Sequence, residues 1–259
     1  LGAMADLSKN KKGFLMIFAF LGILSTSILF FIPYGVWQWS LIIFALSIIG
    51  FSGANIFYDS LLVDVSTNED RNFVSSLGFA LGYLGGGILF LINVLMYLYP
   101  TYFFLETQTE GILYSFLSVA IWWLIFSIPL FLFVKQKTYS NRSDLDNLFK
   151  NSFLRVLTTF QEIKKYKAVL IFLIAYWFYI DAIDTIVRMA VAYGTDLGFD
   201  SSQLIIALIF TQFVGFPATF AYGFLAERYG LFNMLIFGIL VYIFICIYSL
   251  FITSATDFF

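Results

Sequence analysis

Residues 168–193, AVLIFLIAYWFYIDAIDTIVRMAVAY, decide the fold class of this 259-residue chain. The run is long enough to cross the roughly 30 Å hydrocarbon core of a bilayer as a helix. It nevertheless contains Asp181, Asp184 and Arg188. Charges at that depth cost about 2.5–3.5 kcal/mol each on insertion scales, and they commonly mark places where something is bound or moved. The stretch therefore predicts a membrane-spanning helix that carries a functional charge cluster.

The rest of the chain has the composition of a multi-pass membrane protein. Hydrophobic residues make up 61% of it and charged residues 12%, whereas a soluble domain has about a quarter charged residues. Seven apolar runs reach the length of a spanning helix. They cover residues 13–33, 37–62, 73–99, 112–134, 168–193, 203–225 and 232–252. The sequence thus predicts an all-α, polytopic membrane protein.

Basic residues lie on one side of this predicted zig-zag, with Arg188 as the exception. The connecting segments on the other side carry acids, such as Glu106 and Asp196, and no basic residue. Because Lys and Arg are enriched in cytoplasmic loops, we predict that the basic side faces the cytoplasm and that the protein lies in the cell membrane. The basic segments contain Lys9–Lys12, Arg71, Lys135–Lys167 and Arg228.

The composition argues against several classes of function. The chain has no histidine and a single cysteine, Cys246, so it lacks the commonest zinc and haem ligands and cannot form an internal disulfide. Its net charge of −2 gives no basic field that would attract nucleic acid. We therefore expect no metal, no cofactor and no nucleic-acid partner.

The segment 143–165 differs from the spans because its apolar residues recur at helical spacing between charged ones. Ser143 is a candidate N-cap, and Asp144 and Asp146 fall in the first turn, where the helix dipole favours acids. This pattern predicts an amphipathic helix along the cytoplasmic face. We favour a structural tether between two halves of the protein, and a sensor of lipid or of a partner is the alternative.

Gly78, Gly82 and Gly86 fall four residues apart in the third span. Such a stripe allows close approach of a neighbouring helix, since small residues drive helix packing in lipid. We favour static packing, with a moving hinge as a compatible alternative.

The charges of the fifth span share one helical face with Thr185. Asp184 and Arg188 are four residues apart with the acid first, which favours an ion pair. Asp181 then needs another partner: a bound cation, a substrate amine or a proton. The alternative is a structural network that locks helices together.

A second polar group lies in the second span, where Asn55 and Tyr58 accompany Asp59. Asp59 is near the predicted cytoplasmic end, close enough to the interface to be solvated. Both a functional and a merely solvated Asp59 are therefore open interpretations.

Two loops on the basic side have the same pattern, Gly-x-x-Ala-acid. Residues 2–6 read GAMAD before Lys9, Lys11 and Lys12, and residues 223–227 read GFLAE before Arg228. Both resemble the signature loop of the major facilitator superfamily, a Gly-x-x-x-Asp stretch followed by basic residues. The match is partial, because Lys9 and Asn10 stand where Gly and Arg are usual.

This resemblance implies that the loops join helices two to three and eight to nine of about twelve helices. The seven spans would then be helices three to nine of a larger bundle, with five helices missing. Residues 1–134 would be the rest of the N-terminal half, 135–167 the cytoplasmic linker and 168–259 the start of the C-terminal half. The second and fifth spans become helices four and seven, which line the family's central cavity.

Three stretches narrow the resemblance further. Residues 55–62, 78–87 and 179–185 are similar to the branch related to vacuolar amino-acid effluxers. Within the second of them, residues 82–87 resemble the Gly-Pro-x-x-Gly-Gly pattern of exporters. Tyr83 replaces the proline, so the direction of transport cannot be read from it.

These features together predict a secondary transporter that moves a small polar solute by alternating access, as a monomer. An amino acid is the candidate solute, and the proton is the candidate coupling ion. Asp181 or Asp59 would recognise a cationic group or carry protons, and Arg188 would hold a carboxylate once Asp184 releases it. Neutral hydrogen bonds would come from Asn55, Tyr58, Tyr179 and Thr185. The cytoplasmic gate would be formed by Asp6 with Lys11 and by Glu227 with Arg228.

Two other classes of function compete with this hypothesis. A receptor or scaffold would use the buried charges only to pack helices, and it would bind without flux. An intramembrane enzyme would be left with an aspartyl pair, because the chain has no histidine. Asp181 and Asp184 share one helix, whereas a dyad needs carboxylates that converge, so we predict that the protein is not an enzyme.

Overall fold

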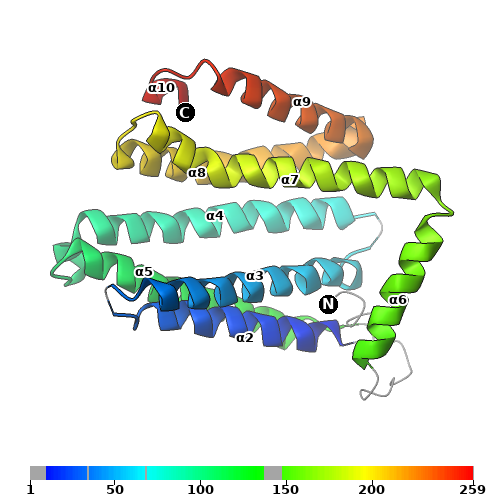
Figure 1. Ribbon diagram of the computed structural model, residues 1–259, viewed down its shortest axis with the longest axis horizontal. Coiled ribbons are helices and arrows are strands. Elements are labelled where there is room, and N and C mark those ends of the chain that lie inside the picture. Colours follow the sequence, from blue (N-terminus) through cyan, green and yellow to red (C-terminus); the bar gives the residue numbers. More distant parts are fainter. Residues whose placement is uncertain (1–9, 34, 68, 137–147, 259) are drawn as a thin grey trace. The chain divides into compact units, whose positions relative to one another are not determined.

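The computed structural model describes residues 10–33, 35–67, 69–136 and 148–258. The predicted partner Asp6, the basic residue Lys9 and the N-cap region 143–147 lie outside these residues. Figure 1 shows the helices in chain order. The described helices are α2 (Lys11–Leu29), α3 (Trp37–Val65), α4 (Arg71–Leu98), α5 (Gln108–Phe133), α6 (Leu148–Ile163), α7 (Lys167–Asp196), α8 (Ser201–Tyr229), α9 (Leu231–Ser249) and α10 (Ala255–Phe258), with a short 3-10 turn η1 (Pro100–Phe103).

Seven of these helices are long and apolar enough to cross a membrane, and they confirm the seven predicted spans. The boundaries differ by up to about a turn. The α8 helix continues to Tyr229, beyond the predicted end at 225, because an α-helix satisfies its own backbone hydrogen bonds whatever its side chains are. In the described part of the chain all regular elements are helical, so the all-α prediction is confirmed.

Local capping signals fix several helix ends. The Asn10 side chain accepts a hydrogen bond from the Gly13 amide at 3.0 Å, which starts α2. Asp200 and Gln203 form a reciprocal capping box at the start of α8. Gly230 separates α8 from α9 with a φ of +87°, a backbone conformation that side chains with a Cβ rarely adopt.

The chain forms two compact units. Of the described residues, those up to 71 and from 88 to 158 form the first unit, and those from 72 to 87 and from 159 onwards form the second. The α4 helix therefore contributes its first part to the second unit and its remainder to the first. This division differs from the predicted halves 1–134 and 168–259, which remain a prediction.

The core of the first unit lies between α2, α3 and α5. Phe57 on α3 is fully buried, and its ring stacks on Phe14 and Phe18 of α2 at centroid distances of 5.4 and 5.7 Å. Leu15 and Leu61 complete the buried cluster. Phe57 and Leu61 face α2, whereas Asn55, Tyr58 and Asp59 of the same helix are exposed.

Small residues allow α2 and α3 to approach closely. A Cβ added at Gly50 would lie 2.9 Å from the Phe18 carbonyl oxygen and would overlap the backbone of Gly22. One turn further along α2, the hydroxyls of Thr26 and Ser47 are hydrogen bonded at 2.7 Å. The small-residue contact of this unit therefore lies in the first two spans.

In the second unit α8 packs along the first part of α4. A Cβ at Gly215 would lie 2.7 Å from the Tyr83 ring, and one at Gly223 would overlap the Ser76 side chain. By contrast, a Cβ at Gly82 or at Gly86 would meet nothing within 4 Å among the described residues. The packing role of Gly78, Gly82 and Gly86 stays a prediction, and the close contacts of α4 at Tyr83 and Ser76 are made with glycines of α8.

Candidate functional site

The charged face of α7 contains the predicted ion pair. The Arg188 guanidinium lies 3.8 Å from the Asp184 carboxylate, and the two side chains are 70% and 64% exposed within the unit. In water such an exposed pair contributes about 0–1 kcal/mol. The same pair is much stronger in a medium of low dielectric constant. The spacing of four residues therefore predicted this contact correctly.

Asp181 behaves differently from its two neighbours. Thr185 donates a hydrogen bond to the Asp181 backbone carbonyl at 2.8 Å, not to the carboxylate. Among the described residues, no hydrogen bond or ion pair reaches the Asp181 carboxylate. Asp181 is exposed within its unit, and Tyr179 is partly buried. That Asp181 binds a cation, an amine or a proton stays a prediction.

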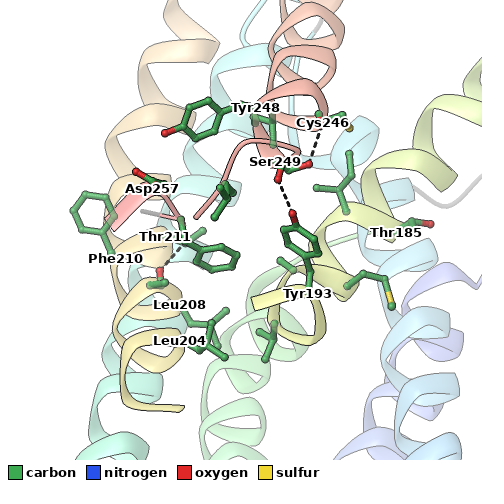
Figure 2. A pocket seen from close by; sticks show the side chains of 18 residues that line it. Thr185, Tyr193, Leu204, Leu208, Phe210, Thr211, Cys246, Tyr248, Ser249 and Asp257 are labelled. Carbon is green, nitrogen blue, oxygen red and sulfur yellow. Dashed lines mark hydrogen bonds between the residues drawn. The ribbon is translucent and has the colours of Figure 1, made fainter. Parts of the chain in front are cut away.

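A cavity of about 580 Å³ lies in the second unit beside this charged face. Thr185, Met189 and Tyr193 line it from α7, and Thr211 and Cys246 line it from α8 and α9. Figure 2 shows Tyr193 pointing towards Ser249, to whose carbonyl its hydroxyl donates a hydrogen bond of 2.5 Å. The lining is mostly apolar.

Of the predicted site residues, Thr185 alone lines this cavity in the described part of the chain. The cavity face of α7 runs through Thr185, Met189 and Tyr193, four residues apart, and the charged face lies next to it. Thr185 stands where the two faces meet. Its hydroxyl proton is used within the helix, so towards the cavity Thr185 offers an acceptor.

The second predicted polar group belongs to the first unit. Asn55, Tyr58 and Asp59 are exposed on α3, and Tyr58 is 49% exposed. Phe57 anchors this turn of α3 to α2 and leaves the three polar side chains on the open side of the helix. A single site that joins this group with the α7 residues stays a prediction.

The predicted gate residue Lys11 has a partner that sequence reasoning missed. Its ammonium lies 3.4 Å from the Asp64 carboxylate and donates a hydrogen bond of 3.1 Å to the Ser60 carbonyl. The Asp64 side chain is 6% exposed and that of Lys11 22%. A signal was available, because the start of the first span and the end of the second lie at the same membrane face.

Neighbouring contacts strengthen this end of the first unit. The Lys12 ammonium donates a hydrogen bond of 2.8 Å to the Val134 carbonyl at the end of α5. The Lys12 amide donates to the Gln136 side chain at 3.2 Å. Two adjacent lysines of α2 therefore hold the ends of α3 and α5.

The predicted gate residues at the end of α8 are Glu227 and Arg228. Glu227 and Arg228 are exposed, and the Arg228 guanidinium lies over the Tyr229 ring at 5.7 Å. Their role in a gate stays a prediction. The described residues contain no group of three or more carboxylates or thiols that could hold a metal ion.

Seven helices that are apolar and long enough to cross a membrane define a multi-pass helical membrane protein. Ion pairs lie at the end of one span and within another. A family model described as vacuole effluxer Atg22 like matches residues 1–69 and 63–258. The chain belongs to this family. The resemblance to the major facilitator superfamily, and to its effluxer branch, is thereby confirmed.

Two curated relatives agree with this assignment. The chain is 40% identical over 259 residues to an uncharacterised MFS-type transporter, YxiO, of Bacillus subtilis (strain 168). It is 30% identical over 140 residues, 47% of its length, to autophagy-related protein 22 of Yarrowia lipolytica (strain CLIB 122 / E 150). The chain spans 60% of the first relative's length, and the second match covers 23% of that relative. No solved structure matches it significantly.

Proposed function

We propose that this chain forms part of a secondary active transporter that moves a small polar solute by alternating access. The observation that carries the proposal is the Asp181 carboxylate, which has no partner among the described residues and lies on a membrane-spanning helix beside an ion pair. A lone carboxylate in a bilayer is costly, so it is kept where it binds or carries something. Family membership supports the same function.

The chemistry of the charged face suits a zwitterion such as an amino acid. Asp181 would bind the ammonium group or carry a proton. Arg188 would bind the carboxylate, since a guanidinium can bind it through two parallel hydrogen bonds. This second contact requires that the ion pair between Asp184 and Arg188 breaks. The pair is exposed and its atoms are 3.8 Å apart, so it can exchange for a contact with the solute.

Polar residues of α3 and α7 would complete the site. Asn55 and Tyr58 would contribute neutral hydrogen bonds, and Asp59 a second acidic group. Tyr179 and Thr185 would contribute further neutral hydrogen bonds from α7. These roles require α3 and α7 to face one central cavity, as the resemblance to the superfamily implies.

The Lys11–Asp64 pair would belong to the cytoplasmic gate. It ties the ends of two helices by a contact between largely buried charges, and such contacts can have two discrete arrangements. We expect the basic segments to face the cytoplasm and the protein to reside in the cell membrane.

Solute flux into liposomes tests the transporter hypothesis directly. The purified protein would be reconstituted and assayed for uptake of each amino acid under an imposed proton gradient, with protein-free liposomes as the control. Uptake above this control for at least one solute is the expected result. Binding of a solute without flux under any gradient would instead support a receptor and would contradict the transporter.

A further inference from the structure

The α6 helix carries an uncovered apolar stripe. Phe153, Val156, Leu157 and Phe160 are 65%, 49%, 46% and 68% exposed. Their spacing of three, four and seven residues puts them on one side of the helix. Ser152, on one flank of the stripe, is buried, so the helix rests against protein there while the stripe stays open.

Exposed lysines lie at one edge of this stripe and after its end. Lys150 lies at the edge, and Lys164, Lys165 and Lys167 follow α6, whereas the exposed Arg155 lies on the opposite side of the helix. Glu162 is the one acid among residues 148–167. An apolar stripe with lysines at its edge and after its end complements a surface that is apolar inside and anionic at its edge.

The connection to α7 places α6 close to a bilayer. The α6 helix ends at Ile163 and α7, a candidate span, begins at Lys167. Four residues reach at most about 14 Å when fully extended. The actual link is tighter, because the Lys165 and Tyr166 amides both donate 2.9 Å hydrogen bonds to the end of α6.

The last turn of α6 belongs to the same compact unit as α7. Within that unit the last turn of α6, the short link and α7 follow one another in the chain (Figure 1). The last turn of α6 is therefore held at the end of a candidate membrane span.

We infer that α6 is a lipid-binding helix, which inserts its apolar stripe into the surface of an anionic membrane. Amphipathic helices of this kind bury their apolar face to a depth of about 5–10 Å. Lys150 and the lysines that follow α6 bind the anionic headgroups. This inference rests on the exposed stripe and charges of α6 and on its short link to α7, and it is independent of the proposed transport.

Spin labels on opposite sides of α6 test this inference in a Cys246→Ser background. Val156→Cys places a label in the stripe, and Thr158→Cys, two residues away on the polar side, is the matched control. The protein would be placed in nanodiscs with and without phosphatidylglycerol. In anionic discs we expect the Val156 label to be relaxed by oxygen and shielded from a water-soluble nickel chelate, and the Thr158 label to show the reverse.

A charge variant tests the anionic component. The substitutions Lys164→Gln and Lys165→Gln each remove one cation. Each is expected to lower the ratio of membrane-inserted α6 to α6 in water about fivefold. A Val156 label that is open to the nickel chelate in every lipid would overturn the inference. A label shielded from both relaxants would overturn it as well, because it would show a protein partner on the stripe. Equal insertion in both kinds of disc would refute the anionic preference.

Discussion

Lys11 and Asp64 show how a single pair of side chains can hold one end of a helical unit. Removal of the Lys11 amine leaves the largely buried Asp64 carboxylate without its cation. Lys11→Met is therefore expected to destabilise the first unit by about 1–3 kcal/mol. Lys11→Met combined with Asp64→Leu is expected to recover most of the loss. Thermal unfolding in detergent measures both, with Glu69→Gln as an exposed control; a double variant no better than the single one would contradict this account.

Asp70, in the turn before α4, gives a pH-dependent prediction at the same scale. Hydrogen bonds from the Thr67 hydroxyl and amide, 2.7 and 2.6 Å long, lower the pKa of the Asp70 carboxyl below its usual range. Since the folded pKa is the lower one, the stabilisation of this turn is present above the usual aspartate pKa and is lost as the pH falls through the lowered value.

Hydrogen exchange of the Thr67 amide, corrected for its intrinsic rate, checks the Asp70 prediction. We expect protection at neutral pH and loss of protection in acid. In Asp70→Asn, which keeps an acceptor but does not titrate, protection should no longer depend on pH. An unchanged pH profile in that variant would assign the effect to another group.

At the scale of helices, two glycines make a matched test of packing. Gly50→Ala is expected to destabilise the protein by about 1–3 kcal/mol, because its Cβ meets backbone atoms of α2 that cannot move aside. Gly82→Ala meets open space within its unit and is expected to change stability by less than about 1 kcal/mol. Chemical unfolding of the two variants compares them. A large loss in Gly82→Ala would instead support the predicted packing role of the glycine stripe.

The elements were largely predictable because their signals are local. Each span is set by its own hydropathy, and the α6 periodicity is visible in its own residues. The Asp184–Arg188 contact follows from a spacing of four within one helix. The Lys11–Asp64 contact could not be identified in this way, because 53 residues separate the partners.

Glycines illustrate the same limit. The stripe at Gly78, Gly82 and Gly86 and the pair Gly22 and Gly50 are equally suited to close packing by sequence alone. Which of them meets a neighbour depends on how the helices are arranged, and this is a property of the tertiary structure. The α2–α3 crossing uses Gly22 and Gly50, and nothing described in the second unit contacts Gly82 or Gly86.

At the scale of the whole molecule, the distribution of basic residues predicts the orientation. Glu106 lies between α4 and α5 and Lys165 between α6 and α7, and both are exposed. In a Cys246→Ser background, Glu106→Cys should react with an impermeant maleimide on intact cells. Lys165→Cys should react only after the membrane is opened. The reverse pattern would invert the orientation and would place the Lys11–Asp64 pair on the outer side.

The central claim is that Asp181 binds or carries the transported charge. The most direct measurement is solute uptake into liposomes as a function of pH for Asp181→Asn. Asp196→Asn, at the end of α7, is the matched control. The account predicts at least about a tenfold loss of flux and a flat pH profile for Asp181→Asn, since a charge-assisted contact is worth about 1.5–3 kcal/mol. Asp196→Asn should behave like the parent protein. Full flux with an unchanged pH profile in Asp181→Asn would contradict the claim.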